Sequence, residues 1–498
     1  MIFKADKRYL LLPVDREAPK RELILRTEDG KIAADLQVCL SPDSGKLFPY
    51  DLRQYRGMTL KSNLDFTPTL TDELPPVLPE LYRPRAHFSP RFGWMNDPNG
   101  LIYYEDRWHL FFQHNPVGTR WGNMHWGHAV SNDLMRWTEG ETVLFPDENG
   151  YMYSGSAVED TENLTGLKEN EHNPLLLFYT ASPNHGVMDA GKVYTQRLAY
   201  SVDGGHTFRK YPKTIVENIA RANRDPKVIF CPEWGKWVMV LYLEEDEYAI
   251  LTSDNLLDWQ IHQRFSMAGD NECPDFFPLQ ADGETYWVFC GAHGRYLVGR
   301  MDSGKFEPVQ EIRRMQDGKC YAAQTYSGVA DGRRIRFGWN KSGMGDGMSQ
   351  GSMTTPHCLT LHRVGEALCL ALQPAREVGA VCHSPVRGRD ELTLQGGAHK
   401  ITVTLPANGK SVITLGELKI EADPENGMVT CGELSGTMTG NTLEIIRDVH
   451  SVECWCGDFL LCIPFLSGDG ALSVCCPGAE MQAWRMDGPF QTGREMVQ

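Results

Sequence analysis

The chain has 498 residues, more than the roughly 100–200 residues of one ordinary domain, so two or three domains are expected. Its 65 acidic and 49 basic side chains give a formal net charge of −16, and no Lys/Arg stripe stands out. This balance argues against nucleic acids and anionic membranes as partners and favours a neutral substrate.

The cysteines and the N-terminus indicate a reducing compartment. None of the 14 cysteines forms a C-x-x-C pair, and several lie in apolar runs, as Cys290 and Cys462 do, so we expect buried thiols and no metal site. The segment MIFKADKRYLLLPVDREAPK has no signal-peptide core, and no run approaches the roughly 18–20 apolar residues that span a bilayer. We therefore expect a cytoplasmic protein.

Residues 1–82 predict a small β-rich module. Short apolar pieces such as RYLLLPV and RELILRT alternate with turn signals at residues 28–30 and 43–45. A proline-rich stretch, TDELPPVLPELYRPRAHFSP, follows and is typical of a linker or a wrapping segment.

Strand-like runs dominate residues 83–375, and no long stretch has a helical period. A strand, an Asp in a turn and an aromatic residue recur in order at Asp133, Asp203, Asp254 and Asp302. Repeats of about 40–50 residues that each form several strands are typical of a β-propeller. Together with the opening segment, the four repeats predict five blades. The alternative is a set of ordinary Asp-containing turns.

The pattern changes between residues 380 and 498. Runs such as HKITVTLPA and NTLEIIRDVHSVECWCG are short strands separated by Gly and Asn turns, which is typical of an antiparallel β-sandwich. The sequence therefore predicts an all-β fold with an N-terminal β-rich module (1–82), a five-bladed β-propeller (83–375) and a C-terminal β-sandwich (380–498).

Three acidic residues stand beside prolines at the starts of strand signals. Asp97 lies in WMNDPNG, Asp225 in NRDPKV and Glu272 in NECPDFF. Arg224 would keep Asp225 ionised, and the apolar neighbours of Glu272 would raise its pKa, as a general acid requires. Asp275 is the competing carboxylate in the third motif. Each motif alone is also explained by a strand-entry turn or a surface ion pair.

Taken together, the three motifs point to one reaction. Propeller symmetry would bring such positions together around the axis. Retaining glycoside cleavage needs a nucleophile and an acid/base about 5–5.5 Å apart. A third carboxylate can bind hydroxyls beside the reacting carbon and stabilise a cationic transition state.

The same stretches carry a resemblance to a known family. HFSPRFGWMNDPNG, FFQHNP, MHWGHAVSNDLMRW, YSGSAV, RDPKV, ECPDFF and YAAQTY occur in this order between residue 87 and about residue 340. In this combination the chain resembles glycoside hydrolase family 32, the group of invertases, inulinases and levanases. The resemblance implies a five-bladed propeller with an attached β-sandwich.

The resemblance also implies roles for individual residues. Asp97 would be the nucleophile, Glu272 the acid/base and Asp225 the transition-state stabiliser. The substrate-binding positions that carry over by motif are Asn96, Gln113, Trp121, Tyr153, Ser154, Arg224 and Trp339. For each of these positions the alternative is a buried packing residue.

The chain also departs from the family pattern. Asn271 stands where members commonly have an aromatic residue before Glu-Cys-Pro, which leaves the leaving-group preference open. A strand that usually ends in Pro-Arg reads MTTPHCLTL here. The N-terminal module is absent from minimal members, so it could shape substrate access, mediate self-association or cover a propeller edge.

The sequence and the resemblance predict a β-fructofuranosidase that releases terminal fructosyl units from sucrose, fructo-oligosaccharides or fructan ends, without a metal or organic cofactor. A fructosyltransferase with the same covalent intermediate and a non-catalytic fructan-binding protein are the alternatives. The expected partner is the fructoside itself, with no nucleic acid or membrane, and self-association stays open. No basic cluster for sucrose 6-phosphate is visible, and His114, His125 and His128 are as readily structural.

Overall fold

Strands make up nearly every regular element of the computed structural model, which describes residues 1–489. The helices of this part of the chain are α1 (Glu377–Ala380) and the short 3-10 helix η1 (Arg53–Tyr55). Within residues 1–489, no helix is long and apolar enough to cross a membrane. The predicted all-β class is confirmed.

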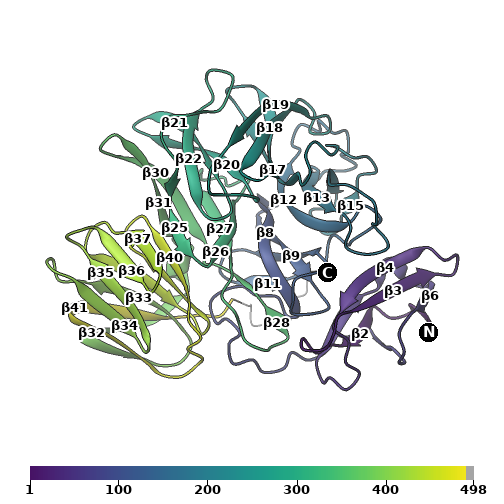
Figure 1. Ribbon diagram of the computed structural model, residues 1–498, viewed down its shortest axis with the longest axis horizontal. Coiled ribbons are helices and arrows are strands. Elements are labelled where there is room, and N and C mark those ends of the chain that lie inside the picture. Colours follow the sequence, from purple (N-terminus) through teal and green to yellow (C-terminus); the bar gives the residue numbers. More distant parts are fainter. Residues whose placement is uncertain (490–498) are drawn as a thin grey trace.

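Five sheets between residues 93 and 374 surround a common centre as the blades of a propeller (Figure 1). The first three blades, from the inner strand outward, are β8 (Gly93–Tyr104), β9 (Arg107–Asn115), β10 (His125–Ser131) and β11 (Trp137–Glu139), with β28 (Ser349–Gln350) beside β8; then β12 (Tyr151–Glu159), β13 (Leu175–Ser182), β14 (Thr195–Ser201) and β15 (Arg209–Lys210); then β16 (Arg224–Cys231), β17 (Lys236–Glu244), β18 (Glu247–Ser253) and β19 (Gln260–Ser266). The last two are β20 (Asp275–Ala281), β21 (Glu284–Cys290), β22 (Arg295–Arg300), β23 (Glu307–Pro308) and β24 (Arg313–Arg314); then β26 (Cys320–Thr325), β27 (Arg334–Asn340), β29 (Ser352–Met353), β30 (His357–Val364) and β31 (Ala367–Pro374). The predicted count of five blades is confirmed.

The sequence repeat marks the turn between the third and fourth strands of a blade. Asp133, Asp203, Asp254 and Asp302 all lie in this turn, in blades one to four in that order. In the first two turns, one carboxylate oxygen accepts hydrogen bonds from two backbone N–H groups of the turn. In blade three the neighbouring Asn255 accepts the two hydrogen bonds, while Asp254 is exposed and pairs with Lys236. Small side chains that satisfy turn N–H groups therefore account for the repeat in blades one to three.

Four of the five inner strands share a bulge near their first residues. The register shifts within residues 95–98 of β8, 153–155 of β12, 224–227 of β16 and 321–324 of β26. A bulge leaves one residue unpaired and re-aims the side chains around it. These four positions supply side chains to the axial cavity described below.

The N-terminal module (residues 1–82) contains two small sheets beside blade one (Figure 1). One has the order β1 (Ile2–Lys4), β6 (Thr59–Ser62), β3 (Arg21–Thr27), β4 (Ile32–Val38), and the other β5 (Leu47–Asp51), β2 (Tyr9–Pro13), β7 (Thr69–Thr71). Their apolar core also takes in Phe92, Val117 and Met348 of the propeller. The module therefore packs on the propeller through a continuous apolar core.

The C-terminal strands form a β-sandwich, as predicted. Its strands are β32 (Cys382–Leu394), β33 (Ala398–Thr404), β34 (Ser411–Leu415), β35 (Leu418–Asp423), β36 (Met428–Cys431), β37 (Leu434–Thr437), β38 (Thr442–Arg447), β39 (Ser451–Trp455), β40 (Leu460–Pro464) and β41 (Leu472–Met486). The long β41 joins the two layers, because its first half pairs with β34 and its second half with β33. Between the layers lies an apolar core that includes Ile401, Ile413, Ile445 and Leu461.

The strands of the three regions lie within the predicted ranges 1–82, 83–375 and 380–498, and the last nine residues are outside the described part. One strand crosses a boundary by pairing: β25 (Gln316–Gly318), within the propeller range, runs parallel to β40 of the sandwich. Whether the three ranges are independent domains stays a prediction.

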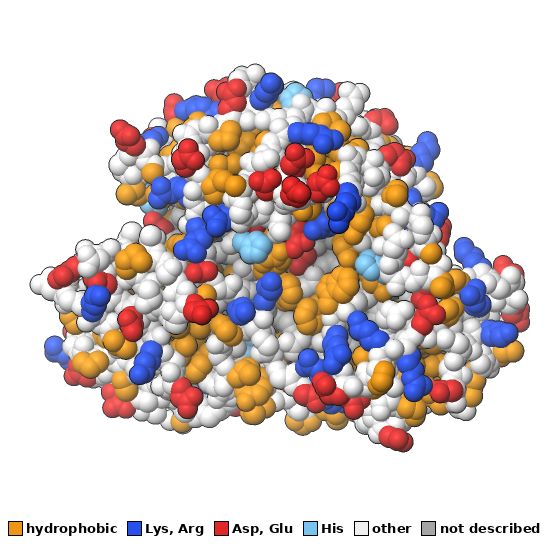
Figure 2. All heavy atoms as spheres, viewed as in Figure 1, with side chains coloured by type: hydrophobic (Ala, Val, Ile, Leu, Met, Phe, Trp, Pro, Cys, Tyr) orange, Lys and Arg blue, Asp and Glu red, His pale blue; other side chains and the backbone are white. Residues whose placement is uncertain are grey.

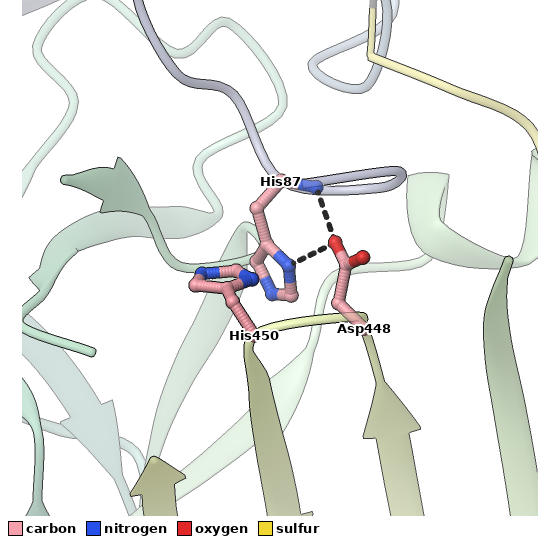
Figure 3. Close-up of side chains that lie close together, drawn as sticks. All are labelled: His87, Asp448 and His450. Atoms are coloured by element: carbon pink, nitrogen blue, oxygen red, sulfur yellow. Dashed lines mark hydrogen bonds and ion pairs between the residues drawn. The ribbon is translucent and has the colours of Figure 1, made fainter. Parts of the chain in front are cut away.

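A buried charged cluster joins the propeller to the sandwich. His87 precedes the first blade, and its ring Nδ1 lies 2.8 Å from Asp448 Oδ2 (Figure 3). Its Nε2 lies 3.5 Å from Glu453 Oε1. Burial lowers the pKa of His87, but the two carboxylates outweigh it and raise this pKa to about 10. The His450 ring packs against the His87 ring edge to face. The cluster is thus a cation held between two buried anions.

Metal binding does not explain this cluster, although His87, Asp448 and His450 lie close enough together to suggest it. Both oxygens of Asp448 already accept hydrogen bonds from N–H groups. The donors are the backbone N–H groups of Arg85, Ala86, His87 and Val449 and the ring of His87. A cation at this carboxylate would face these donors, so the cluster serves as a contact between propeller and sandwich.

We expect His87→Gln to lower the free energy of unfolding by about 3–5 kcal/mol, because it leaves two buried carboxylates without their cation. The stability due to the His87 charge is complete below its unfolded pKa, near 6.5, and is lost as pH rises through about 10. The share from Asp448, whose pKa is lowered, is lost as pH falls below about 4. Thermal unfolding measured across this pH range checks both limits.

His172→Gln is the matched control for that measurement. His172 pairs with Glu105 at 2.8 Å, but both side chains are substantially exposed. Exposed pairs contribute at most about 1 kcal/mol. Equal destabilisation by the two substitutions would contradict the role of the buried cluster.

Candidate active site

A cavity of about 300 Å³ opens at the centre of the propeller, where Figure 2 shows a hollow bordered by charged side chains. Its lining includes all ten residues that the sequence predicts for the site: Asn96, Asp97, Gln113, Trp121, Tyr153, Ser154, Arg224, Asp225, Glu272 and Trp339. The lining also includes Tyr194 and Tyr321, which the sequence reasoning missed. The structure therefore brings the predicted residues to one place, while their chemical roles stay predictions.

Each of the five inner strands, or the turn before it, contributes to this cavity. Asp97 lies on β8, Ser154 on β12, Asp225 on β16 and Tyr321 on β26, whereas Glu272 lies in the turn before β20. Asp225 has φ 64° and Glu272 has φ 42°, in the left-handed region that non-glycine residues rarely adopt. Such backbone strain is retained only where the surrounding structure enforces it, which is common at functional sites.

Asp97 is a buried carboxylate with defined partners. Its Oδ2 accepts a hydrogen bond of 2.6 Å from the Ser154 hydroxyl and lies 3.4 Å from the Cys273 thiol. Burial raises the pKa of Asp97, and the hydrogen bond from Ser154 offsets this only in part. The nearby charge of Glu272 raises it further.

Asp225 shares the same thiol with Asp97. Its Oδ2 lies 3.5 Å from Cys273 Sγ and accepts a hydrogen bond of 3.0 Å from the backbone N–H of Cys273. The neighbouring Arg224 guanidinium lies 3.6 Å away, as the Arg-Asp pair in the sequence predicts. Burial nevertheless raises the pKa of Asp225 to about 7, because Arg224 offsets it only in part, which corrects the expectation that Arg224 keeps Asp225 ionised.

Glu272 is held by two hydrogen-bond donors, and this corrects a prediction. Arg224 Nη2 donates to Glu272 Oε2 at 2.9 Å, and the Tyr321 hydroxyl donates to Oε1. Burial raises the pKa of Glu272, but these two donors and the charge of Arg224 outweigh it, so the pKa is lowered rather than raised. The apolar residues beside Glu272 in sequence are not what surrounds its carboxylate.

The competing carboxylate and the three histidines do not line the cavity. Asp275 is buried at the start of β20, where it pairs with Lys227 at 2.9 Å. His114, His125 and His128 are buried, and burial lowers the pKa of each below the usual histidine value. The burial of the three histidines away from the cavity therefore fits a structural role.

Aromatic side chains form much of the remaining lining. Trp339 contacts Tyr321 and Trp94 edge to face, with ring centroids 6.2 and 5.6 Å apart. Trp121 is 43% exposed and meets Tyr153 edge to face at 6.2 Å. Aromatic faces of this kind can pack on the apolar faces of sugars.

Of the two residues that sequence reasoning missed, only Tyr321 had a signal. It opens the YAAQTY stretch that contributes to the family resemblance, whereas nothing in the sequence around Tyr194 distinguishes it. The bond from Tyr321 to Glu272 depends on two different blades, so no local pattern could predict it.

The Tyr321 hydroxyl donates to Glu272 and so stabilises its charged form. We therefore expect Tyr321→Phe, which removes this hydroxyl, to raise the pKa of Glu272. If Glu272 must be protonated for catalysis, the alkaline limb of the kcat/KM profile then moves to higher pH. Tyr194→Phe, which changes another cavity tyrosine, should leave that limb in place. An alkaline limb that does not move in Tyr321→Phe would show that Glu272 does not set it.

Comparisons with known proteins agree with this geometry. A family model described as "Glycosyl hydrolases family 32 N-terminal domain" matches residues 87–371. A levanase from Bacillus subtilis is 39% identical over 286 residues, which cover 52% of this chain and 41% of the levanase. An extracellular exo-inulinase from Aspergillus awamori is 32% identical over 377 residues, which cover 65% of this chain and 70% of the inulinase. The chain therefore spans less than half of the levanase.

Solved structures show the same architecture. The crystal structure of the Aspergillus awamori exo-inulinase has a TM-score of 0.73 at 26% identity, covering 82% of this chain and 99% of that one. A β-fructofuranosidase from Schwanniomyces occidentalis, complexed with fructosyl-erythritol, has a TM-score of 0.71 at 24% identity, covering 82% of this chain and 98% of that one, which shows the fold alone. The match of the family model to more than half of the sequence, on the propeller that forms the cavity, establishes that this chain belongs to glycoside hydrolase family 32.

Proposed function

We propose that the protein is a β-fructofuranosidase that hydrolyses terminal fructosyl units with retention of configuration. The observation that carries this is the position of one thiol: Cys273 Sγ contacts the carboxylates of both Asp97 and Asp225, and Glu272 is the preceding residue. Three carboxyl groups thus surround one cavity of about 300 Å³, a volume suited to a small ligand. The levanase, inulinase and invertase names of the relatives support a fructoside as the substrate.

In the first step, a carboxylate oxygen of Asp97 bonds to the anomeric carbon of the fructosyl unit. The bond from this carbon to the glycosidic oxygen breaks, and Glu272 gives its proton to that oxygen as it leaves. Asp225, on the other side of the Cys273 thiol, accepts hydrogen bonds from fructosyl hydroxyls and stabilises the cationic transition state. A fructosyl ester on Asp97 results.

In the second step, water replaces the leaving group. Glu272 removes a proton from the water, whose oxygen bonds to the anomeric carbon as the bond to Asp97 breaks. Two inversions at one carbon restore the original configuration. Asp97 is again a carboxylate and Glu272 again carries a proton.

Substrate binding has to redistribute protons within the site. In the free site the raised pKa values lie on Asp97 and Asp225, and the lowered one on Glu272. Protons of interacting carboxyl groups belong to the cluster rather than to one residue. Fructosyl hydroxyls that donate to Asp225 stabilise its charged form, which moves a shared proton toward Glu272.

A comparative assay tests this function. Sucrose, sucrose 6-phosphate, 1-kestose, inulin and levan are each supplied, and released fructose is measured, with its anomeric form followed by NMR at early times. Fructose released first as the β-furanose supports the proposal. No fructose from any of these substrates would refute it, and mainly transfer products at high sucrose would identify a fructosyltransferase.

The cytoplasmic location is also a proposal. All 14 cysteines are free, and the buried sulfurs of Cys454 and Cys456 lie 3.8 Å apart without a bond between them. Free thiols persist in reducing compartments. Fractionation of the source cells, with the protein detected by antibody, tests the location.

A further inference from the structure

The N-terminal module reaches the wall of the active-site cavity through the free edge of β4. In the sheet order β1-β6-β3-β4, β4 has a strand on one side only. On its open side, the backbone N–H of Gln37 donates to Asn123 Oδ1 at 2.8 Å, and Asn123 Nδ2 donates to the Gln37 carbonyl at 2.9 Å. This is the pairing that a further strand would make. Asn123 is fully buried and stands two residues after Trp121 of the cavity lining.

A second contact from β4 holds another segment near the cavity. Asp35 is 5% exposed, and its Oδ2 accepts a hydrogen bond of 3.0 Å from the backbone N–H of Met188. The carboxylate fits against Gly186 so closely that a Cβ there would lie 2.2 Å from Asp35 Oδ2. Asp35 therefore fixes the loop of residues 184–189 against the module.

That loop carries His185, which supports the aromatic part of the cavity wall. The His185 ring stacks on Tyr151 with centroids 4.0 Å apart, nearly parallel. It meets Trp121 edge to face at 5.9 Å and lies tilted against Tyr153 at 5.7 Å. Burial lowers the pKa of His185, so the ring packs there as a neutral group. Trp121 is 43% exposed and contacts the rings of His185 and Tyr153. Asn123, two residues further on, anchors the segment that carries it.

We propose that the N-terminal module positions the fructosyl pocket, with Asp35 acting through His185 on Trp121 and Tyr153. The inference rests on the proposed function, in which Trp121 and Tyr153 contact the terminal fructosyl unit. All substrates share this unit, so the module controls how tightly the unit is bound and not which leaving group is accepted. Asp35 is thus a positioning residue, more than one contact away from the substrate.

The central test is Asp35→Ala. We expect the KM for sucrose to rise about three- to tenfold, the loss expected for a displaced aromatic contact, while kcat stays within about twofold. Product inhibition by fructose should weaken to the same extent. The ratio of kcat/KM for sucrose to that for 1-kestose should stay constant.

Two variants serve as controls. Asp35→Asn keeps an oxygen that can accept the Met188 N–H, so it should restore most of the lost affinity. Asp65→Ala removes an exposed carboxylate of the same module, which pairs with Arg21, and should change neither KM nor fructose inhibition. Thermal unfolding of each variant separates a local effect from a loss of the fold.

A double-mutant cycle tests the route of the effect. If Asp35 acts through His185, Asp35→Ala should have little further effect on KM in a His185→Ala background. Gly186→Ala disturbs the same contact from the propeller side and should raise KM even if Asp35→Ala fails to fold.

An unchanged KM in both Asp35→Ala and Gly186→Ala, independent effects in the cycle, or a changed ratio of sucrose to 1-kestose would each overturn the inference. The proposed function is tested separately, because it fails if the unmodified protein releases no fructose. In that case calorimetry with fructose still compares binding by the parent protein and the variants.

Discussion

Asp97→Asn should lower kcat for fructose release by on the order of 10⁴-fold or more, the scale of losing a catalytic nucleophile. The amide has nearly the same shape and still accepts the hydrogen bond from Ser154, so the site should keep its geometry. It cannot form the ester with the anomeric carbon, because a neutral amide oxygen is a poor nucleophile. Fructose release from sucrose, with circular dichroism to check the fold, measures the effect.

Asp254→Asn is the matched control, because it makes the same chemical change at an exposed turn of blade three. Its activity should equal that of the parent protein. Near-parent activity of Asp97→Asn would remove Asp97 from the mechanism. The alternative of a non-catalytic fructan-binding protein predicts no activity in either protein.

Glu272→Ala should lower kcat/KM for sucrose by about 10²–10⁴-fold, the usual contribution of a general acid/base. The loss should be much smaller for an aryl β-fructofuranoside, whose leaving group departs without a proton. Azide should then speed the second step by attacking the ester on Asp97 without base catalysis. Chromatography and NMR should identify the product as a fructosyl azide of retained configuration.

Glu366→Gln, at an exposed residue of blade five, is the control for this substitution and should behave as the parent protein. Equal losses for sucrose and the aryl fructoside would contradict proton donation by Glu272. An azide product of inverted configuration would contradict the covalent intermediate. The first result therefore tests proton donation by Glu272, and the second tests the covalent ester on Asp97.

The incorrect pKa prediction for Glu272 shows a limit of reading neighbours along the chain. Phe276 and Phe277 follow it closely in sequence, but both are fully buried in the cores between blades. The carboxylate itself meets Arg224 of blade three and Tyr321 of blade five. Successive residues at a strand start point in different directions, so sequence neighbours do not define the surroundings of a side chain.

The repeat in the propeller, in contrast, could be predicted from residues that are neighbours in the sequence. A turn residue that satisfies nearby N–H groups acts within four residues, so its pattern is visible in sequence, and the predicted blades were correct. In blade three, Asp254 and Asn255 lie in the same turn, and Asn255 makes the two hydrogen bonds because both residue types suit such a turn. Because these hydrogen bonds are local, the repeat could be recognised in the sequence.

By itself the sequence determined the strands and the five-blade repeat, because apolar alternation and turn residues act over a few residues. It also supplied the three acidic motifs, whereas the seven substrate-binding positions found in the cavity lining came from the resemblance to the family. Only the tertiary structure decided which partners each carboxylate has. It placed Cys273 between Asp97 and Asp225, and it set two donors on Glu272. It also placed β4 of the N-terminal module against Asn123, two residues after Trp121. These contacts join residues far apart in the chain, and their energies depend on burial and distance, which exist only once the blades have closed around the axis.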